Sequence, residues 1–153
     1  MLRSSLPKIS LPGSANLALP VRQLRWAILV FDLDPTTGHE QGGERRALVV
    51  SYDAFHRSLL ATICPITAAR STPEYPNEVA IPRGEGGQTK DGVILCHQVR
   101  TVSLERVTGT APRILGYVSN PEIRTAVRAA LAVHLGLDMP SHADGANTSE
   151  QYR

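Results

Sequence analysis

The sequence predicts a mainly β domain of the α+β class, in which short antiparallel strands build a sandwich or small barrel and one C-terminal helix follows them. Three observations predict this fold. Short apolar runs alternate with breaks rich in Gly, Pro and Asp. The runs follow one another at a spacing typical of antiparallel sheets rather than of βαβ units. The clearest helical pattern lies near the C-terminus, between a capping signal and a glycine.

The strands are expected at the apolar runs, each of which is short and bounded by turn residues. The predicted strands are Ala27–Leu33, Ala47–Ser51, Leu59–Ile66, Asn77–Ile81, Val93–Cys96, Val99–Val102 and Ile114–Val118. Pro65 lies inside one of them and has no backbone N–H to donate. We therefore expect an edge position or a bulge at this residue.

The helix is expected between Ser119 and Gly136. Ser119 is a suitable N-cap, Glu122 completes a capping box with it, and Pro121 suits the first turn. Gly136 is a typical C-terminal stop. The residues that share one face at helical spacing are Ile123, Val127, Ala130, Leu131 and His134.

Length and composition indicate one ordinary globular domain. The chain has 153 residues, of which 42% are hydrophobic and 20% are charged. Its formal net charge of +2 does not indicate a nucleic-acid binder, so an anion site must come from local clustering of charge. No apolar run approaches the roughly 18 residues that a membrane helix needs, and we expect no membrane partner.

Composition also divides the chain into three parts. Residues 1–20 are rich in Pro and Ser without periodicity, so we expect a disordered arm or, alternatively, an over-extended start. Residues 21–137 are expected to form the folded domain. Residues 138–153 show no apolar face and are expected to be a flexible, mildly acidic tail.

The cysteines and the N-terminal segment bear on the cellular compartment. Cys64 and Cys96 lie in apolar runs and form no CxxC pattern, so we expect two buried thiols. Pro7, Pro12 and Pro20 interrupt the continuous apolar stretch that a signal peptide needs. These observations predict a reducing, cytoplasmic location.

Two glycine-rich polar segments are candidates for contacts with phosphate. Residues 38–46 lie between two predicted strands, where glycines let a phosphate approach backbone N–H groups and an arginine matches its oxygens. On spacing alone, a solvated hairpin loop is the simpler interpretation. His39 and Glu40 form no HExxH motif, and no metal site is expected. Residues 83–90 lack the ending and the helix of a P-loop, which excludes a nucleoside triphosphate site there.

Polar residues near two further strands complete the set of candidates. Thr67 ends the apolar run CPIT, where a threonine commonly satisfies its own backbone. Residues 96–101, CHQVRT, alternate as a half-exposed strand would, which puts Gln98 and Arg100 on one face. For His97 a surface histidine is the simpler interpretation.

Taken together, five blocks in register resemble the MazF/PemK family of toxins. The blocks are DLDPTTGHEQGGERRALVVS (32–51), CPIT (64–67), YPNEVAIP (75–82), DGVILCHQVRT (91–101) and VSNPE with a helix that ends in LGL (118–137), and the likeness spans roughly residues 25–137. The resemblance implies a small SH3-like β-barrel of the CcdB/PemK type in a homodimer. It also implies a sequence-specific endoribonuclease that cleaves single-stranded mRNA without a metal or other cofactor. A cognate antitoxin would hold it inactive, and the toxin–antitoxin complex could bind DNA weakly.

The resemblance further implies roles for individual residues. Its catalytic positions fall on Arg45 at the start of a strand, on Thr67 in the Pro-Ile-Thr block, and on Glu40 in the Gly-x-Glu-Gln loop. Arg45 suits a clamp on phosphoryl oxygens and Thr67 a hydrogen bond to them. For proton transfer the candidates are Glu40 and the imidazoles of His39 and His97. The residues expected to contact RNA are His39, Gln41, Arg46, Tyr75, Gln98 and Arg100.

The chain departs from the family pattern at four positions. Trp26 and Ala27 stand where the family has glycine and an acidic residue. Arg46 replaces a proline, and His97 replaces an acidic residue. Two alternatives therefore stay open beside an active nuclease: a catalytically impaired member, and a CcdB-like toxin that acts by binding a protein.

Overall fold

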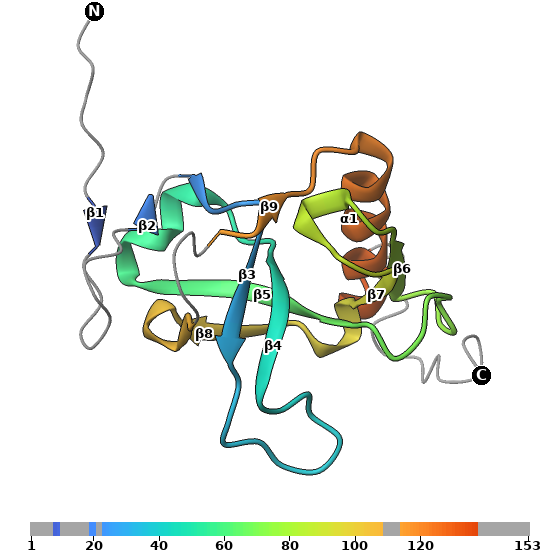
Figure 1. The fold of residues 1–153 in the computed structure, drawn as a ribbon, viewed down its shortest axis with the longest axis horizontal. Helices are drawn as coiled ribbons and strands as arrows, with labels where there is room; N and C mark the ends of the chain where they lie inside the picture. Colours follow the sequence, from blue (N-terminus) through green and yellow to red (C-terminus); the bar gives the residue numbers. More distant parts are fainter. Residues whose placement is uncertain (1–7, 10–18, 21–22, 109–113, 138–153) are drawn as a thin grey trace, which may run out of the picture.

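The computed structural model of the chain describes residues 8–9, 19–20, 23–108 and 114–137 (Figure 1). The strands are β1 (Lys8–Ile9), β2 (Leu19–Pro20), β3 (Ala27–Asp32), β4 (Glu44–Val49), β5 (Leu60–Thr67), β6 (Glu78–Ile81), β7 (Gly92–Leu95), β8 (Arg100–Ser103) and β9 (Gly116–Tyr117). The 3-10 segments are η2 (Asp53–Ser58), η3 (Glu85–Gly87), η4 (Cys96–Gln98) and η5 (Leu104–Arg106), and the α-helix is α1 (Pro121–Leu135). β1 pairs with β2 inside the predicted arm. The rest of residues 1–20 and the predicted tail, 138–153, lie outside the described residues.

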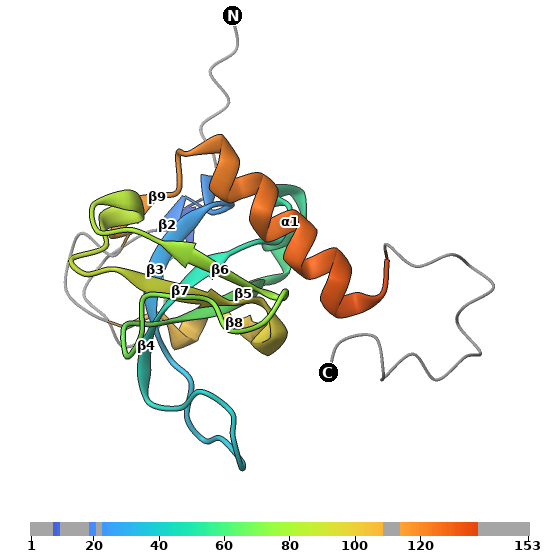
Figure 2. The same ribbon diagram turned by 90° about the vertical axis from the view of Figure 1, so that its right-hand side faces the viewer.

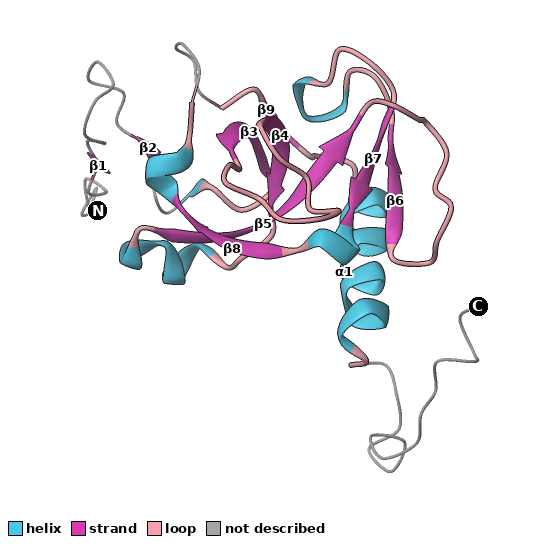
Figure 3. Cartoon of the chain, turned by 90° about the horizontal axis from the view of Figure 1, so that it is seen from below, coloured by secondary structure: helices cyan, strands magenta, loops and turns pink. Residues whose placement is uncertain are grey.

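Strands β3 to β9 form one curled antiparallel sheet. Its order is β6-β7-β5-β4-β3-β9, and β8 pairs with the first half of β5. The sheet curls into a half-barrel (Figure 3), and α1 lies beside β6 (Figure 2). The buried face of α1 holds Ile123, Val127 and Ala130, whereas His134, predicted on the same face, is exposed. The mainly β, barrel-like fold with a C-terminal helix is therefore confirmed.

Both faces of the central strands are buried, which explains why they are continuous apolar runs in the sequence. On β3, Leu29 and Phe31 belong to a first core shared with β8 and η5, whereas Ile28 belongs to a second core shared with β6, β7 and α1. Cys64 and Cys96 are both buried in the second core, as predicted. A hydrogen bond between the two thiols, together with burial, raises the pKa of Cys64.

Pro65 belongs to a central strand rather than an edge strand, but it has a strand partner on one side only, as a residue at an edge position would. β5 pairs with β4 on one side, where Pro65 lies opposite Ala47. On its other side, β5 pairs with β8 as far as Ile63 and with β7 from Ile66 onward. Pro65 falls between these two partners, where its missing N–H interrupts neither the β7 nor the β8 ladder.

The prediction of one half-exposed strand over residues 96–101 is wrong. Residues 96–98 form the short 3-10 segment η4, and β8 begins only at Arg100. Gln98 and Arg100 therefore belong to different elements and do not share a strand face. A single 3-10 turn is too short to show its own periodicity in the sequence. The mixture of apolar and polar residues from 96 to 101 was therefore interpreted as the alternation of a strand.

The helix begins one residue later than its predicted cap. Asn120, rather than Ser119, is the N-cap, and its side-chain oxygen accepts the N–H of Glu122. Ser119 instead donates its N–H and its hydroxyl to the carboxylate of Glu85 in η3. The N–H of Asn120 donates to the same carboxylate, and these hydrogen bonds hold the pKa of Glu85 below its ordinary value. Gly136 ends the helix with a φ of 68°, as predicted.

The glycines of residues 83–90 pack against the sheet. Gly86 and Gly87 both have positive φ angles. A Cβ on Gly87 would lie 2.2 Å from the carbonyl oxygen of Leu115, and one on Gly86 would lie 2.5 Å from Cδ1 of Ile28. These glycines therefore permit η3 to approach β9 and β3 closely, which is a structural role.

Gly87→Ala is expected to destabilise the fold more than Gly38→Ala. The two glycines have similar φ angles, +74° and +61°, but nothing lies within 4 Å of a Cβ on Gly38. Left-handed strain alone should lower the free energy of unfolding by about 1–2 kcal/mol. The clash at Gly87 should add about 1–3 kcal/mol. Chemical denaturation of both variants measures the difference, and equal losses would contradict the close packing of η3.

Candidate functional site

Arg45 and Thr67 are brought together by the pairing of β4 with β5. The antiparallel register sets Ala47 opposite Pro65, and its continuation by two residues on each strand sets Arg45 opposite Thr67. Because side chains alternate along a strand, Arg45 and Thr67 lie on the same face of the sheet. Both residues line one surface pocket, which we name the Arg45–Thr67 pocket.

The Arg45–Thr67 pocket has a volume of about 530 Å³ and offers two free hydrogen-bond donors. Among the described residues, no carboxylate lies within ion-pair distance of the Arg45 guanidinium, which donates only to the carbonyl oxygen of Glu44 at 3.2 Å. The Oγ1 atom of Thr67 accepts the N–H of Ala69 at 3.2 Å, so its own hydrogen is left to donate. An anion in the pocket can therefore receive a charged and a neutral hydrogen bond. The polar lining residues are Gln41, Glu44, Arg45, Arg46, Thr67 and Gln88.

A second arginine, Arg46, also lines the Arg45–Thr67 pocket. Nη1 of Arg46 donates to the carbonyl oxygen of Gly87 at 3.1 Å and to Oε1 of Gln88 at 3.0 Å. Gln88 is 5% exposed, so the residues packed around it hold in place the side chain to which Arg46 donates. Arg46 thus adds positive charge to the pocket at the position where the resembling family has proline. Sequence reasoning missed Gln88, because a glutamine in a distant loop carries no local signal.

Other residues predicted to act on RNA line a second pocket of about 540 Å³, the His39–Arg100 pocket. Its lining residues are His39, Glu40, His97, Gln98, Val99 and Arg100. The loop between β3 and β4 separates the two pockets, because Glu40 lines the second and its neighbour Gln41 lines the first.

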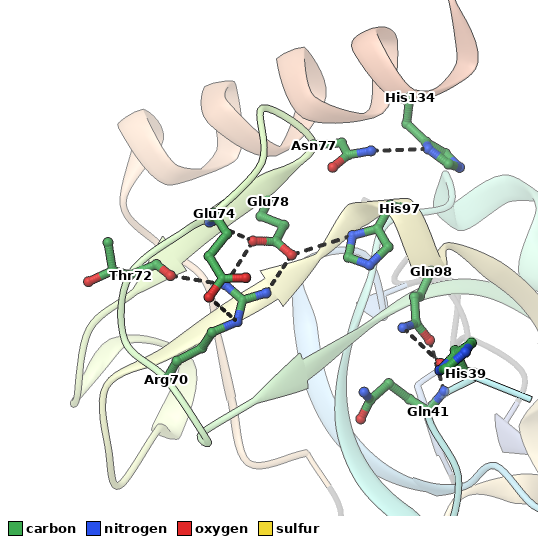
Figure 4. A network of polar contacts seen from close by, with 10 residues as sticks. All are labelled: His39, Gln41, Arg70, Thr72, Glu74, Asn77, Glu78, His97, Gln98 and His134. Atoms are coloured by element: carbon green, nitrogen blue, oxygen red, sulfur yellow. Dashed lines mark hydrogen bonds and ion pairs between the residues drawn. The ribbon is translucent and has the colours of Figure 1, made fainter. Parts of the chain in front are cut away.

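The side-chain amide of Gln98 holds the β3–β4 loop in place. Its Oε1 accepts the N–H of Gln41 at 2.8 Å, and its Nε2 donates to the carbonyl oxygen of His39 at 3.4 Å (Figure 4). Both contacts are made to main-chain atoms of the loop. Gln98 therefore positions the segment that divides the pockets, and its predicted contact with RNA stays a prediction.

Five predicted residues do not line the pocket of Arg45 and Thr67: His39, Glu40, Tyr75, Gln98 and Arg100. Glu40 lines the His39–Arg100 pocket, and its carboxylate accepts the N–H of Thr37 at 3.2 Å. The acidic residue that lines the Arg45–Thr67 pocket is Glu44. Tyr75 lies between β5 and β6 with its side chain 59% exposed, and it lines neither of the two pockets.

A buried carboxylate, that of Glu78, joins several segments beside the His39–Arg100 pocket. Its side chain is 1% exposed and accepts Nη1 and Nη2 of Arg70 at 2.8 and 2.5 Å and the N–H of Glu74 at 2.8 Å (Figure 4). Nδ1 of His97 lies 3.7 Å from the same carboxylate. Burial by itself raises the pKa of Glu78, but the hydrogen bonds from Arg70 and Glu74 hold the pKa below its ordinary value. Glu78 is therefore charged at neutral pH.

The departure at Trp26 leaves both pockets untouched. Trp26 precedes β3, at the opposite end of that strand from the β3–β4 loop, and its φ of +70° is one that favours glycine. The guanidinium carbons of Arg25, Arg124 and Arg128 lie 5.2, 5.4 and 5.2 Å from the centroid of the indole. Trp26 and Ala27 are both buried in the hydrophobic cores. The backbone thus keeps a glycine-like conformation although the side chain has changed.

Among the described residues, no group of three or more His, Cys, Asp and Glu side chains is arranged to hold a metal ion. Their one α-helix, α1, is too short and too polar to cross a lipid bilayer.

Glu78→Gln should destabilise the protein at neutral pH, because it removes the charge that pairs with Arg70. We expect the free energy of unfolding to fall by about 1–3 kcal/mol. Since the pKa of Glu78 is lowered in the folded state, its contribution is complete above the ordinary carboxyl pKa and is lost as the pH falls through the lowered value. Denaturation at a series of pH values should therefore show a difference from the parent that shrinks in acid.

Glu74→Gln is the matched control for this experiment. The Glu74 carboxylate is 61% exposed and 3.8 Å from Nε of Arg70, so its loss should have a small effect at every pH. A Glu78→Gln effect that did not change with pH, or that was no larger than the Glu74→Gln effect, would contradict the buried ion pair.

The comparisons with known proteins agree over nearly the whole described domain. Residues 24–135 match the family model described as "PemK-like, MazF-like toxin of type II toxin-antitoxin system". The chain is 35% identical over 114 residues to endoribonuclease EndoA of Bacillus subtilis, a match that covers 74% of this chain and 94% of that protein.

Solved structures of similar proteins share the fold. A crystal structure of MazF from Deinococcus radiodurans has a TM-score of 0.61 and 29% identity, and the match covers 73% of this chain and 94% of that chain. A MazE–MazF structure from the same organism has a TM-score of 0.55 and 25% identity, and the match covers 73% and 93% of the two chains. The chain therefore belongs to the family of PemK-like, MazF-like toxins of type II toxin–antitoxin systems.

Proposed function

We propose that the protein is the endoribonuclease toxin of a type II toxin–antitoxin pair and that it cleaves single-stranded RNA in the cytoplasm at the Arg45–Thr67 pocket. One observation carries this proposal: the guanidinium of Arg45, free of any carboxylate among the described residues, lines the same pocket as the hydroxyl of Thr67. The similarity to the endoribonuclease EndoA and to MazF supports the nuclease activity.

The chemistry that fits these groups uses the RNA as its own nucleophile. The 2′-hydroxyl attacks the adjacent phosphorus, a P–O2′ bond forms and the P–O5′ bond breaks. The products are a 2′,3′-cyclic phosphate and a free 5′-hydroxyl. The protein must remove the 2′ proton, stabilise the charge that develops on the phosphoryl oxygens, and supply a proton to the leaving oxygen.

Arg45 and Thr67 are assigned to the phosphoryl oxygens. A guanidinium can donate to two oxygens at once and stays protonated at neutral pH, so it stabilises charge and cannot act as the base. The Thr67 hydroxyl adds a neutral donor. Arg46, held by Gln88, brings a further positive charge to the same pocket and supports a site for a phosphodiester.

Glu44 is assigned to the proton transfer that the family resemblance suggested for Glu40. Both are glutamates of the same hairpin, but only Glu44 lines the pocket of Arg45 and Thr67. A general base must lie within hydrogen-bond reach of the proton that it takes, directly or through one water. We assign Glu40 to the neighbouring His39–Arg100 pocket, where the RNA chain would continue on either side of the scissile phosphate.

The proposed partners follow from the family. We propose a cognate antitoxin that carries an acidic segment, because a pocket that binds phosphodiesters also attracts carboxylates. The pairing of MazE with MazF in the similar structure from Deinococcus radiodurans supports such a partner. We also propose a homodimer and weak DNA binding by the toxin–antitoxin complex, both on the strength of the resemblance.

Arg45→Ala should lower the rate of RNA cleavage by about 10²–10³-fold, because it removes a charged donor from the transition state. Thr67→Val should lower the rate by roughly 10-fold, and Thr67→Ser should retain most of the activity because it keeps the hydroxyl. The assay is cleavage of a long single-stranded RNA in EDTA, with mapping of the product ends.

Arg83→Ala is the matched control, since Arg83 is exposed and lines neither pocket. Cleavage by Arg45→Ala at the parental rate would show that the assignment of Arg45 is wrong. Absence of cleavage by the parent would favour an impaired toxin, or a toxin that acts by binding a protein.

Glu44→Gln should lower the single-turnover cleavage rate by about 10²-fold or more, because the 2′ proton then has no carboxylate to receive it. Glu40→Gln is isosteric and lies in the same hairpin, so it is a matched control and should have a smaller effect on this rate. If the larger loss falls on Glu40→Gln, the carboxylate suggested by the loop motif is the base and the assignment to Glu44 is incorrect.

A further inference from the structure

The imidazole of His97 lies between a buried charge and an open pocket. Its Nδ1 atom is buried, has no hydrogen-bond partner, and lies 3.7 Å from Oε1 of Glu78 (Figure 4). The side chain as a whole is 31% exposed and lines the His39–Arg100 pocket. The exposed part of the ring is therefore the part away from Glu78.

The buried carboxylate fixes which ring nitrogen carries the proton. Arg70 and Glu74 donate to Glu78, which keeps it anionic at neutral pH. A neutral imidazole that turned the lone pair of Nδ1 toward this carboxylate would be repelled by it. The favoured tautomer has the proton on Nδ1, facing Glu78, and leaves Nε2 as a hydrogen-bond acceptor.

The imidazole is neutral under ordinary conditions. Burial lowers the pKa of His97, the carboxylate of Glu78 on β6 opposes this effect, and the electrostatic influence of His134 on α1 and of Arg70 before β6 lowers the pKa further. The net result is a pKa below the ordinary histidine value. At neutral pH the ring is therefore an acceptor at Nε2 rather than a donor at both nitrogens.

Nε2 of His97 is available to a ligand. It has no hydrogen-bond partner among the described residues and is not one of the buried unpaired atoms, so it is open to solvent. The same pocket is lined by the carboxylate-bearing Glu40, a second acceptor, and by Arg100, whose guanidinium can stack on a base. With a volume of about 540 Å³, the pocket has room for a planar ring.

We propose that the His39–Arg100 pocket binds one nucleobase beside the scissile phosphate and that Nε2 of His97 accepts a hydrogen bond from the exocyclic amino group of that base. Adenine, cytosine and guanine carry such a group and uracil does not. The pocket should therefore disfavour uracil at one position of the cleavage site. This inference rests on the proposed cleavage of RNA, and it adds His97 as a residue that determines which RNA sequence is cleaved.

The test removes one hydrogen-bonding group from each side of the contact. Mapping cleavage in a randomised RNA first gives the position at which uracil is rejected. At that position the amino group is then deleted, with purine riboside for adenosine, inosine for guanosine, or pyrimidin-2-one riboside for cytidine. On the protein side, His97→Asn keeps an atom near the place of Nδ1 and has none at Nε2. Arg83→Ala removes an exposed residue that lines neither pocket and is the control.

With the parent and with Arg83→Ala, loss of the amino group should lower kcat/KM by roughly 5- to 100-fold at this single position. His97→Asn should cleave the natural RNA more slowly by a similar factor and lose nothing further with the analogue. A merely structural role of His97 would not produce this coupling. If the parent accepts uracil and the analogues at every position, or if His97→Asn still shows the full penalty, the inference is overturned.

Equilibrium binding to an RNA with a 2′-deoxy sugar at the scissile position separates this inference from the proposed function. This RNA lacks the nucleophile, so it reports binding alone. A chain that shows the same coupling in Kd but does not cleave natural RNA would overturn the nuclease and support the base-binding pocket. A chain that neither binds nor cleaves would overturn both. The measurements that change only the base of the RNA use the unmodified protein. The test therefore does not depend on whether His97→Asn folds.

Discussion

The register between β4 and β5 is the constraint on which the site depends. Cross-strand partners in this pair enter the same core: Leu48 and Cys64 enter the second, and Val49 and Ile63 enter the first. A slip by one residue would exchange the two faces and expose apolar side chains, so burial of these residues fixes the pairing. The same register continues to Arg45 and Thr67 at the strand ends. Hydrophobic packing in the sheet thus determines where the guanidinium of Arg45 lies.

The sequence predicted the features that depend on local chemistry. Apolar runs gave the strands, because burial on both faces leaves a continuous signal in the chain. The family resemblance indicated Arg45 and Thr67, and the structure brings them to one pocket. The cap of α1 was predicted one residue early, because Ser119 and Asn120 are both good caps and only the distant carboxylate of Glu85 decides between them.

The features that sequence reasoning missed depend on contacts between distant segments. Glu78 carries one weak signal, a carboxylate at the start of an apolar strand, and nothing in the sequence pairs it with Arg70. The loop motif suggested that Glu40 lies beside Arg45. Which of the two pockets a residue of the β3–β4 loop lines depends on the hydrogen bonds from Gln98 to the loop, and these cannot be predicted from the loop's own sequence. One further missed feature is local: residues 96–98 form a single 3-10 turn, and one turn is too short to be distinguished from a strand by its pattern of polar side chains.

The contact between Gln98 and the β3–β4 loop has a consequence for how such toxins change over time. Gln98 binds only peptide groups of the loop, the N–H of residue 41 and the carbonyl of residue 39. Hydrogen bonds to backbone atoms do not depend on which side chains residues 39 and 41 carry. Mutations at positions 39 and 41 can therefore accumulate without detaching the loop, and the lining of both pockets can vary on an unaltered scaffold.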